Sequence, residues 1–399
     1  MAGPAERLNS PISTAELERR WAAVRAAMSD RGIDVLLMQN NNDFMGGYVK
    51  YFTDFPASNG YAVTVVFPKD DDMTFISQAP FGLDRKLPPG GDGIRRGVGK
   101  ITGSPSYVSA GYTNAYDAEL AAKALERFSG GKIGLVGTGA IGFSLVDQLK
   151  RGRLSNSTFV DASDVVDRIK VIKSDEELAL IRRTAEMQDA CMMAAFAAIK
   201  PGMRDIEVAA VAEQVGHSYG SEQGLFLCAS GPIGTAAPFV HRHLQNREIR
   251  EGDYFSLLVE SNGPGGFYTE LGRTCVLGKA TDEMKDEHAF ILEAQKFTLK
   301  LLRPGAASKD IWEAYNQFMR ENGKPPEQRL FCHGQGYDMV ERPLVRFDES
   351  MTIQKRMNLS CHPTYALERS FNWTCDNFVI GDNGPEHIHK CPQKIFELG

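Results

Sequence analysis

The stretch from Phe331 to Pro343 is where side chains able to carry or share a proton are most crowded. Gly334 and Gly336 leave its backbone free to follow a tight path. Polar side chains held on a loop above a rigid scaffold often form functional sites. We therefore predict acid–base or ligand-binding chemistry here, with a glycine-rich turn and a solvated Glu–Arg pair as the structural alternative. The side chains concerned are His333, Tyr337, Asp338, Glu341 and Arg342.

The size and composition of the chain limit its scaffold and its partners. At 399 residues it exceeds the roughly 250–300 residues at which a single core stops growing, which predicts two domains. A net charge of −6 without any basic cluster argues against nucleic acid as a partner. No apolar run approaches the ~20 residues of a membrane span, and no secretory signal follows Met1. The seven cysteines form no C-x-x-C motif, so we expect reduced thiols and a cytoplasmic protein.

The first half of the chain has the pattern of an α/β domain. Ser13 and Glu16 have capping-box spacing at the start of an amphipathic helix, and a buried strand is expected at 33–38. Strands at 61–67 and 73–77 are predicted to form a hairpin. The remaining predicted elements are helices at 118–128 and 162–169 and strands at 132–136 and 158–160.

A G-x-G-x-x-G motif occupies residues 137–142, between a predicted strand and a predicted helix. Asp161 ends the next predicted strand, and this spacing is the one that a dinucleotide-binding fold uses. The motif follows strands that form hairpins, however, and not the repeated βαβ units of that fold. We therefore expect a glycine-lined turn with close helix–strand packing, and no cofactor.

The second half of the chain contains an internal repeat. A helix capped by Ser174 ends at the break at 200–202, and a second helix and antiparallel strands follow; the same order recurs from Asp282, with a break at 303–305. This predicts paired sheets that form one curved surface under helices, with a ligand seam between the halves. Strands are expected at 225–229, 254–260, 266–277, 329–332, 356–361 and 372–380. The expected domains are 1–171 and 172–399, the second consisting of repeats at about 172–280 and 281–399.

Three phrases of the sequence resemble recurring phrases of the creatinase/aminopeptidase P superfamily, the M24-like proteins with the pita-bread fold. They are KSDEEL at 173–178, EGD at 251–253 and YTELGRT at 268–274. The resemblance covers the whole chain. It implies an α/β N-terminal domain and a duplicated α+β pita-bread domain with a curved antiparallel sheet. It also implies a homodimer in which the N-terminal domain of one subunit borders the active site of its neighbour.

Peptidases of this superfamily hold two metal ions with two aspartates, a histidine and two glutamates. Carried over by position, these ligands fall on Leu258, Glu270, Tyr337, His362 and Cys375. Leucine has no ligand atom, and hard two-metal sites are built from bridging carboxylates. The resemblance therefore places the chain in the metal-free, creatinase-like branch, without metal ligands. A mixed zinc site of His362, Cys375 and Glu270 is the alternative.

The resemblance also suggests which side chains perform the chemistry. His241 matches the histidine that transfers protons in relatives with and without metal, and imidazole titrates near neutral pH. Glu260 and Leu258 are two residues apart on one predicted strand and therefore share a face. The predicted catalytic residues are His241, Glu260, Glu270, Tyr337 and His362. The predicted substrate-binding residues are His243, His333, Asp338, Glu341, Arg342 and Cys375, and a purely structural role is the alternative for each.

The predicted function is a metal-independent hydrolase that cleaves a C–N bond in a small nitrogenous metabolite, as an amidinohydrolase or a cyclic-amidine hydrolase does. Creatine itself fits poorly, because the two catalytic carboxylates of creatinase fall on Gly272 and His362. One alternative is a lyase resembling the dimethylsulfoniopropionate lyases, and another is an Xaa-Pro-type peptidase. A third is a catalytically inactive binding module, similar to the peptidase-like domains of histone-chaperone proteins.

Overall fold

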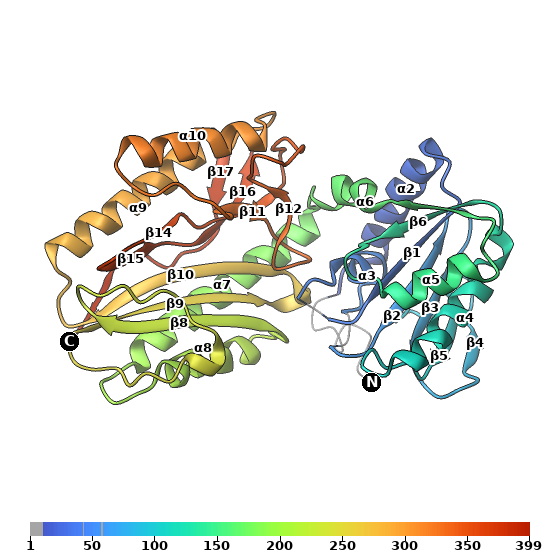
Figure 1. Cartoon of the computed structure of the whole chain (residues 1–399), viewed down its shortest axis with the longest axis horizontal. Coiled ribbons are helices and arrows are strands. Elements are labelled where there is room, and N and C mark those ends of the chain that lie inside the picture. The colour runs from blue at the N-terminus through green and yellow to red at the C-terminus, as the bar shows by residue number, and fades with distance from the viewer. Residues whose placement is uncertain (1–10, 43, 57–58) are drawn as a thin grey trace. The chain divides into compact units, whose positions relative to one another are not determined.

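The computed structural model describes residues 11–42, 44–56 and 59–399. These residues form two units, Met1–Lys170 and Val171–Gly399, each with its own sheets and cores (Figure 1). Within the described residues, no helix combines the length and the apolar character that crossing a bilayer requires.

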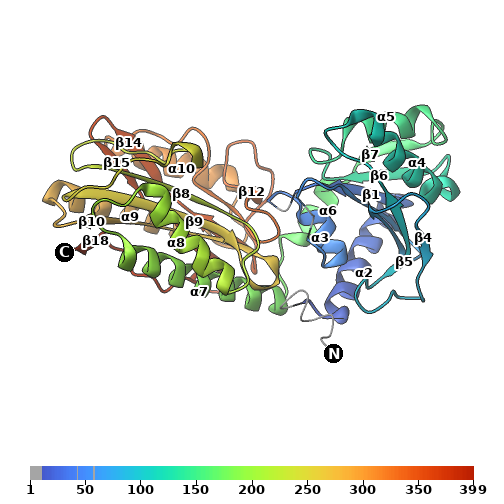
Figure 2. The same ribbon diagram turned by 90° about the horizontal axis from the view of Figure 1, so that it is seen from below.

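The N-terminal unit is built on a seven-stranded mixed sheet in the order β4-β5-β3-β2-β1-β6-β7. Helices α4 and α5 cover one face, and α2, α3 and α6 cover the other (Figure 2). Strands β2 and β3 pair antiparallel, which confirms the predicted hairpin, whereas β6 lies parallel between β1 and β7. The strands are β1 Val35–Asn40, β2 Val63–Pro68, β3 Met73–Gln78, β4 Asp84–Lys86, β5 Val98–Ser104, β6 Lys132–Val136 and β7 Thr158–Asp161. The helices are α2 Thr14–Asp30, α3 Gly47–Thr53, α4 Asn114–Leu125, α5 Phe143–Arg151 and α6 Ser163–Lys170, with 3-10 turns at Gly111–Thr113 and Glu126–Phe128.

The glycine-rich turn between β6 and α5 is packed against protein groups. Gly137 has a φ of 71°, a left-handed conformation that glycine adopts without strain. Its N–H donates to the Ser163 hydroxyl at 2.9 Å, and the N–H of Gly142 donates to the Gln39 side chain at 3.1 Å. These two backbone donors are therefore used inside the N-terminal unit, as expected for a structural turn.

The C-terminal unit contains two open sheets and a hairpin. A four-stranded sheet has the order β18-β10-β9-β8, a five-stranded sheet has the order β12-β11-β13-β16-β17, and β14 pairs with β15. Helices α7 and α8 pack against the first sheet, and α9 and α10 pack with the second (Figure 1). The helices are α7 Asp175–Ala198, α8 Asp205–Ser218, α9 Asp282–Leu301 and α10 Ser308–Glu321, with 3-10 turns at Arg242–Leu244 and Pro264–Gly266. The strands are β8 Gly224–Pro232, β9 Asp253–Asn262, β10 Tyr268–Leu277, β11 Cys332–Gly334, β12 Glu341–Leu344, β13 Asn358–Cys361, β14 Thr364–Leu367, β15 Ser370–Trp373, β16 Asp376–Gly381, β17 Gly384–His387 and β18 Phe396–Leu398.

The local signals explain why these elements begin where they do. At the start of α7, the Ser174 side chain accepts from the Glu177 N–H and the Glu177 carboxylate accepts from the Ser174 N–H, so the predicted capping box is confirmed. Two predicted strands were wrong in detail. The segment 372–380 is broken between β15 and β16, and the strand expected at 329–332 begins only at Cys332.

The two sheets join at Gly272 in the middle of β10. Its N–H donates to the Cys375 carbonyl at 3.0 Å, in a bridge that links β10 to the segment between β15 and β16. This junction brings the faces of both sheets to one place, where the predicted ligand seam is expected.

Candidate active site

A cavity of about 640 Å³ opens where the two sheets of the C-terminal unit meet. Its walls are mostly apolar and aromatic, and its polar groups are few, as in sites for small molecules. Leu258 and Glu260 both line it, which confirms that they share a face of β9. The lining residues are Leu225, Leu227, Pro238, Phe239, Leu258, Glu260, Glu270, Glu327, Arg329, Leu330, His333, Met339, Val340, His362, Thr364, Tyr365, Ala366, Phe371 and Trp373.

One carboxylate and two imidazoles converge at this cavity. The Nε2 atom of His333 lies 3.3 Å from Glu270 Oε1, and the Nε2 atom of His362 lies 3.7 Å from the same oxygen. Glu270 comes from β10, His333 from β11, and His362 directly follows β13, so both sheets contribute. The three ligand atoms all lie within 4.8 Å of one another, close enough to share one cation.

Neighbouring backbone and hydroxyl groups fix the orientation of these side chains. The Nδ1 atom of His333 lies 2.9 Å from the Gly334 carbonyl oxygen. Because a carbonyl oxygen only accepts, Nδ1 carries a hydrogen, and Nε2 is the ring nitrogen that faces Glu270. The Ser360 hydroxyl donates to Glu270 Oε1 from the other side.

A second carboxylate, Glu260, lies directly opposite Glu270 in the β9–β10 pairing. Gln335 donates to Glu260 Oε1 at 3.2 Å and to the Met339 carbonyl at 2.9 Å. The Asn377 side chain donates to the side-chain oxygen of Gln335 at 3.0 Å and accepts from the Glu270 N–H at 2.7 Å. An amide network therefore holds the two carboxylates side by side at the buried end of the cavity.

The environment moves the pKa values of the two carboxylates in opposite directions. Burial and the neighbouring charge of Glu270 raise the pKa of Glu260 well above its usual value. Burial would also raise the pKa of Glu270, but His362, His333 and the Ser360 hydroxyl lower it to about 2. Burial lowers the pKa of His362 to about 4, although Glu270 opposes the shift. Glu270 is therefore the ionised member of the carboxylate pair, and the His362 imidazole is neutral near pH 7.

Several predicted site residues in the stretch 331–343 do not line the cavity. The Tyr337 hydroxyl donates to Glu177 on α7, and its ring packs against Phe267. The Glu341 carboxylate pairs with Lys173, and Arg342 pairs with Glu349 at 2.6 Å. Asp338 is buried away from the cavity lining. These four side chains therefore do not line the cavity, whereas His333, Met339 and Val340 do. Their predicted roles at the site stay predictions.

Three other predicted residues also lie outside the lining. His241 and His243 are exposed and stack on each other with ring centroids 5.9 Å apart, two and four residues beyond Phe239. Cys375 is fully buried, and its thiol contacts the Glu270 carbonyl at 3.7 Å and the Ser360 hydroxyl at 3.5 Å. Burial raises the pKa of the Cys375 thiol well above its usual value. This agrees with the purely structural role that is the alternative to substrate binding.

Ser360 and Arg329 act on the two carboxylates and were not predicted as site residues. The sequence pattern could have identified Ser360, because it lies two residues before His362 and therefore on the same face of an extended segment. No sequence pattern identifies Arg329, because it lies in an irregular segment before β11. Arg329 is exposed at the cavity, and its positive charge opposes part of the rise in the pKa of Glu260.

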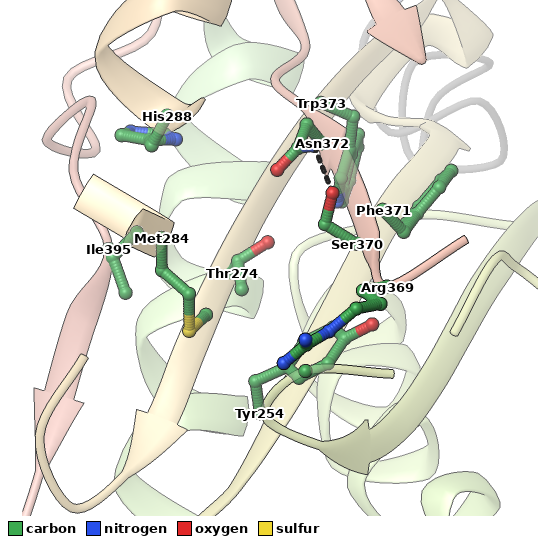
Figure 3. A pocket seen from close by; sticks show the side chains of 11 residues that line it. Tyr254, Thr274, Met284, His288, Arg369, Ser370, Phe371, Asn372, Trp373 and Ile395 are labelled. Carbon is green, nitrogen blue, oxygen red and sulfur yellow. Dashed lines mark hydrogen bonds between the residues drawn. The ribbon is translucent and has the colours of Figure 1, made fainter. Parts of the chain in front are cut away.

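A second, smaller hollow lies behind the β14–β15 hairpin and shares Trp373 and Phe371 with the cavity (Figure 3). Its volume is about 40 Å³, which is room for a water molecule but not for a metabolite. Tyr254, Thr274, Met284 and His288 also line it, and Asn372 donates to Ser370 at 2.9 Å beside it. We assign this hollow to packing.

The fold and the cavity together define a two-unit protein whose site is formed by paired open sheets. The sequence profile of metallopeptidase family M24 matches residues 179–383, slightly more than half of the chain. The chain therefore belongs to metallopeptidase family M24, and the predicted superfamily is confirmed.

Several proteins are similar in sequence to the chain over most of its length. An uncharacterized hydrolase/peptidase, y4tL, of Sinorhizobium fredii is 26% identical over 96% of each chain. Xaa-Pro dipeptidase of Pyrococcus furiosus is 25% identical over 64% of this chain and 74% of its own, and creatinase of a Bacillus species is 24% identical over 97% and 93%. The crystal structure of X-Pro aminopeptidase from Thermotoga maritima superposes with a TM-score of 0.76 at 19% identity, over 95% of this chain and 99% of its own. These matches confirm the predicted fold class.

The family name implies metal, and the donor atoms at the cavity test that implication. A two-metal centre needs carboxylates that bridge the ions. Among the described residues, the cluster able to share an ion at this cavity contains one carboxylate, that of Glu270. Leu258 is apolar, and one oxygen of Glu260 accepts from Gln335. The donors therefore do not fit a two-metal centre, whereas Glu270, His333 and His362 fit one ion.

Proposed function

We propose that the chain is a hydrolase that cleaves a C–N bond in a small nitrogenous compound. The observation that carries the proposal is the pair of buried carboxylates, Glu260 and Glu270, beside two imidazoles at the closed end of an apolar cavity. Carboxylates and imidazoles held together in this way accept and return protons during hydrolysis. The relationship to creatinase and to Xaa-Pro dipeptidase, both named for substrates with C–N bonds, supports the same reaction class.

The cavity favours a small substrate with opposite charges at its ends. Four aromatic side chains, those of Phe239, Tyr365, Phe371 and Trp373, provide faces that attract a cationic or polarised nitrogen group. The carboxylates lie at the buried end, and the Arg329 guanidinium lies at the exposed end. We therefore propose an amino-acid-like compound, whose nitrogen group points to Glu260 and Glu270 and whose carboxylate points to Arg329.

We assign the proton transfer to Glu260, because it lines the cavity beside Glu270. In the proposed step, Glu260 starts protonated and gives its proton to the leaving nitrogen as the C–N bond breaks. The oxygen of a water molecule bonds to the carbon, and the proton that this water loses returns to Glu260. Glu270 and the two imidazoles hold the water and the reacting group in place. His241 is exposed and does not line the cavity, so its predicted role as general base stays a prediction.

The expected metal independence rested on the absence of a ligand atom at Leu258 and on Glu270 as the one remaining carboxylate, with Tyr337 in the position of the metal-binding histidine. His333 lies at the cavity instead, and Tyr337 does not. Metal independence is therefore not part of the proposed function, which consists of the reaction and the substrate class.

The proposal is tested by screening N-amidino and N-acyl amino acids, cyclic amidines and Xaa-Pro dipeptides in ¹⁸O-labelled water. Hydrolysis transfers the solvent oxygen to a product, which mass spectrometry detects. We expect Glu260→Gln to lower kcat by roughly 10²–10⁴-fold, the usual contribution of a proton-transfer group. Glu186→Gln is the matched control, because Glu186 is an exposed carboxylate paired with Lys390 on the outer side of α7.

Each other outcome identifies a different function. A product without solvent oxygen indicates the lyase alternative and contradicts hydrolysis. Turnover confined to Xaa-Pro dipeptides indicates a peptidase. Tight binding of a compound without any turnover, unchanged by Glu260→Gln, indicates the binding module.

A further inference from the structure

We infer that Glu270, His333 and His362 bind a single divalent transition-metal ion of the zinc class, in place of the two-metal centre that the resemblance to the peptidases implies. The inference concerns one site, one ion and a donor set of one carboxylate oxygen and two imidazole nitrogens. It is independent of which C–N bond the enzyme cleaves.

The orientation of His333 is the first argument. Its Nδ1–H is committed to the Gly334 carbonyl, so Nε2 is the ring nitrogen that is directed at Glu270 Oε1. Histidines that ligate metals are held in this manner, with the second ring nitrogen donating to a backbone carbonyl or a carboxylate.

The distances are the second argument. With metal–ligand bonds of about 2.0–2.1 Å, two ligand atoms on a tetrahedral ion lie roughly 3.3 Å apart. The His333–Glu270 separation is 3.3 Å, and the His362–Glu270 separation is 3.7 Å. The three donors therefore surround a volume of the right size before any side chain moves.

The surroundings provide the remaining features of a catalytic metal site. The side chains of Glu270 and His333 are 4% and 3% exposed, and that of His362 is 13% exposed. Ser360 donates to the ligating carboxylate, which orients it as an outer-shell partner does. All three donors also line the cavity, so a fourth position is open to water or substrate.

The donor types select the class of ion. Two imidazoles and one carboxylate suit zinc, cobalt(II) or iron(II), whereas magnesium and calcium prefer oxygen ligands throughout. Cys375 does not complete the set, because its thiol is directed at the Glu270 carbonyl and at Ser360.

A second group of possible ligands, Asp376, His387 and His389, does not form a comparable site. Asp376 already pairs with Arg273 at 2.6 Å, and a guanidinium in that position repels a metal ion. Both ring nitrogens of His389 are used, since Nδ1 accepts from the Asn377 N–H and Nε2 lies 3.2 Å from the Gln188 side-chain oxygen. This second group therefore supplies a matched control.

The test is metal binding by the chelator-stripped full chain, measured with zinc by calorimetry and elemental analysis and with cobalt(II) by visible absorption. We expect one ion per chain and a cobalt spectrum typical of nitrogen and oxygen ligands. His333→Gln and His362→Gln should each weaken zinc binding by more than the ~10–100-fold that loss of an outer-shell partner costs. His387→Gln should bind zinc as the unmodified chain does.

Thermal unfolding of each variant, with and without zinc, provides the readout of folding. Zinc should raise the Tm of the unmodified chain and of His387→Gln, but not that of His333→Gln. No bound zinc, two ions per chain, or loss of binding in His387→Gln alone would each overturn the inference. The labelled-water test of hydrolysis is unaffected by these results, so the two proposals fail separately.

Discussion

The charge of the cavity changes sign between its buried end and its exposed end. Glu260 and Glu270 are 6% and 3% exposed, whereas Arg329 is an exposed residue at the same cavity. Among the residues that the structure describes, no hydrogen bond or ion pair involves the Arg329 guanidinium; its backbone N–H alone is tied down, to Glu327 at 2.7 Å. A guanidinium that has no partner among the described residues can use its planar set of N–H donors to bind a carboxylate on the substrate.

Replacing Arg329 with Gln should therefore weaken substrate binding without disabling the chemistry. Loss of a charge-assisted hydrogen bond costs about 1.5–3 kcal/mol, which predicts a rise in KM of roughly 10–100-fold with kcat nearly unchanged. Steady-state kinetics measures both constants on the substrate found in labelled water. Arg329→Lys should restore part of the affinity, and a substrate analogue with an amide in place of its carboxylate should not respond to either variant. A large loss of kcat, or an equal effect on the analogue, would contradict this role.

At the scale of elements, the junction of the two sheets controls the shape of the cavity. Gly272 on β10 lies under the ring of Trp373 from β15, and a Cβ at this position would overlap the ring. Trp373 and its neighbour Phe371 line the cavity, and Phe239 packs edge-on against both. The absence of a side chain at Gly272 therefore permits both the bridge to Cys375 and the position of the aromatic wall.

Gly272→Ala should accordingly be more harmful than its size suggests. Overpacking a tight interior costs about 1–3 kcal/mol, and displacement of Trp373 should raise KM as well. Urea unfolding and steady-state kinetics measure the two effects. Gly139→Ala is the control, because nothing lies within 4 Å of the added Cβ, and its stability should change by less than about 0.5 kcal/mol. Equal stability of the two variants would show that the junction tolerates a side chain.

The helices and strands were largely predictable from the sequence, but the directions in which loop side chains point were not. Capping signals and apolar periodicity located α2, α7 and the β9–β10 hairpin, and strand alternation placed Glu260 on the cavity face. The alternation of side chains along β11 ends at Gly334, so it does not predict where the Tyr337 side chain points. The direction of that side chain is set by its hydrogen bond to Glu177, which lies 160 residues away in sequence. His333 reaches the cavity because β11 pairs with β13, where its partner is Ser360, and no local pattern specifies that register.

At the scale of the C-terminal unit, each sheet supplies half of the site. The β9–β10 pair carries the two glutamates, and the β11–β13 pair carries His333, Ser360 and the residue before His362. Members of family M24 can therefore differ in chemistry through a few positions on facing strands, while the paired sheets are retained. The homodimer implied by the resemblance stays a prediction, and so does its shared active site.

The stability of the whole chain should fall as the pH drops below about 6.5, because buried histidines are held neutral in the folded state, His288 and His389 among them. Burial lowers the pKa of His288 to about 4, assisted by the charge of Arg273, and burial lowers that of His389 to about 3, assisted by Arg273 and His387 and opposed by Asp376. Figure 3 shows His288 beside the small hollow behind the β14–β15 hairpin. One His288 ring nitrogen is buried without a hydrogen-bond partner in the described structure.

The sign of the effect follows from which state binds the proton first. In unfolded chain both imidazoles have a pKa near 6.5, so between pH 6.5 and 4 the unfolded state binds more protons and acidification favours it. Each histidine contributes at most about 1.4 kcal/mol per pH unit to the slope, and the contribution is complete above pH 6.5. Urea unfolding at pH 7.5, 6.5, 5.5 and 4.5 measures the slope, and His288→Gln should make it shallower by up to that amount. His217→Gln, at an exposed histidine on α8, should leave it unchanged. A free energy of unfolding that stays constant from pH 6.5 to 4.5 would mean that these imidazoles are not kept neutral by the fold.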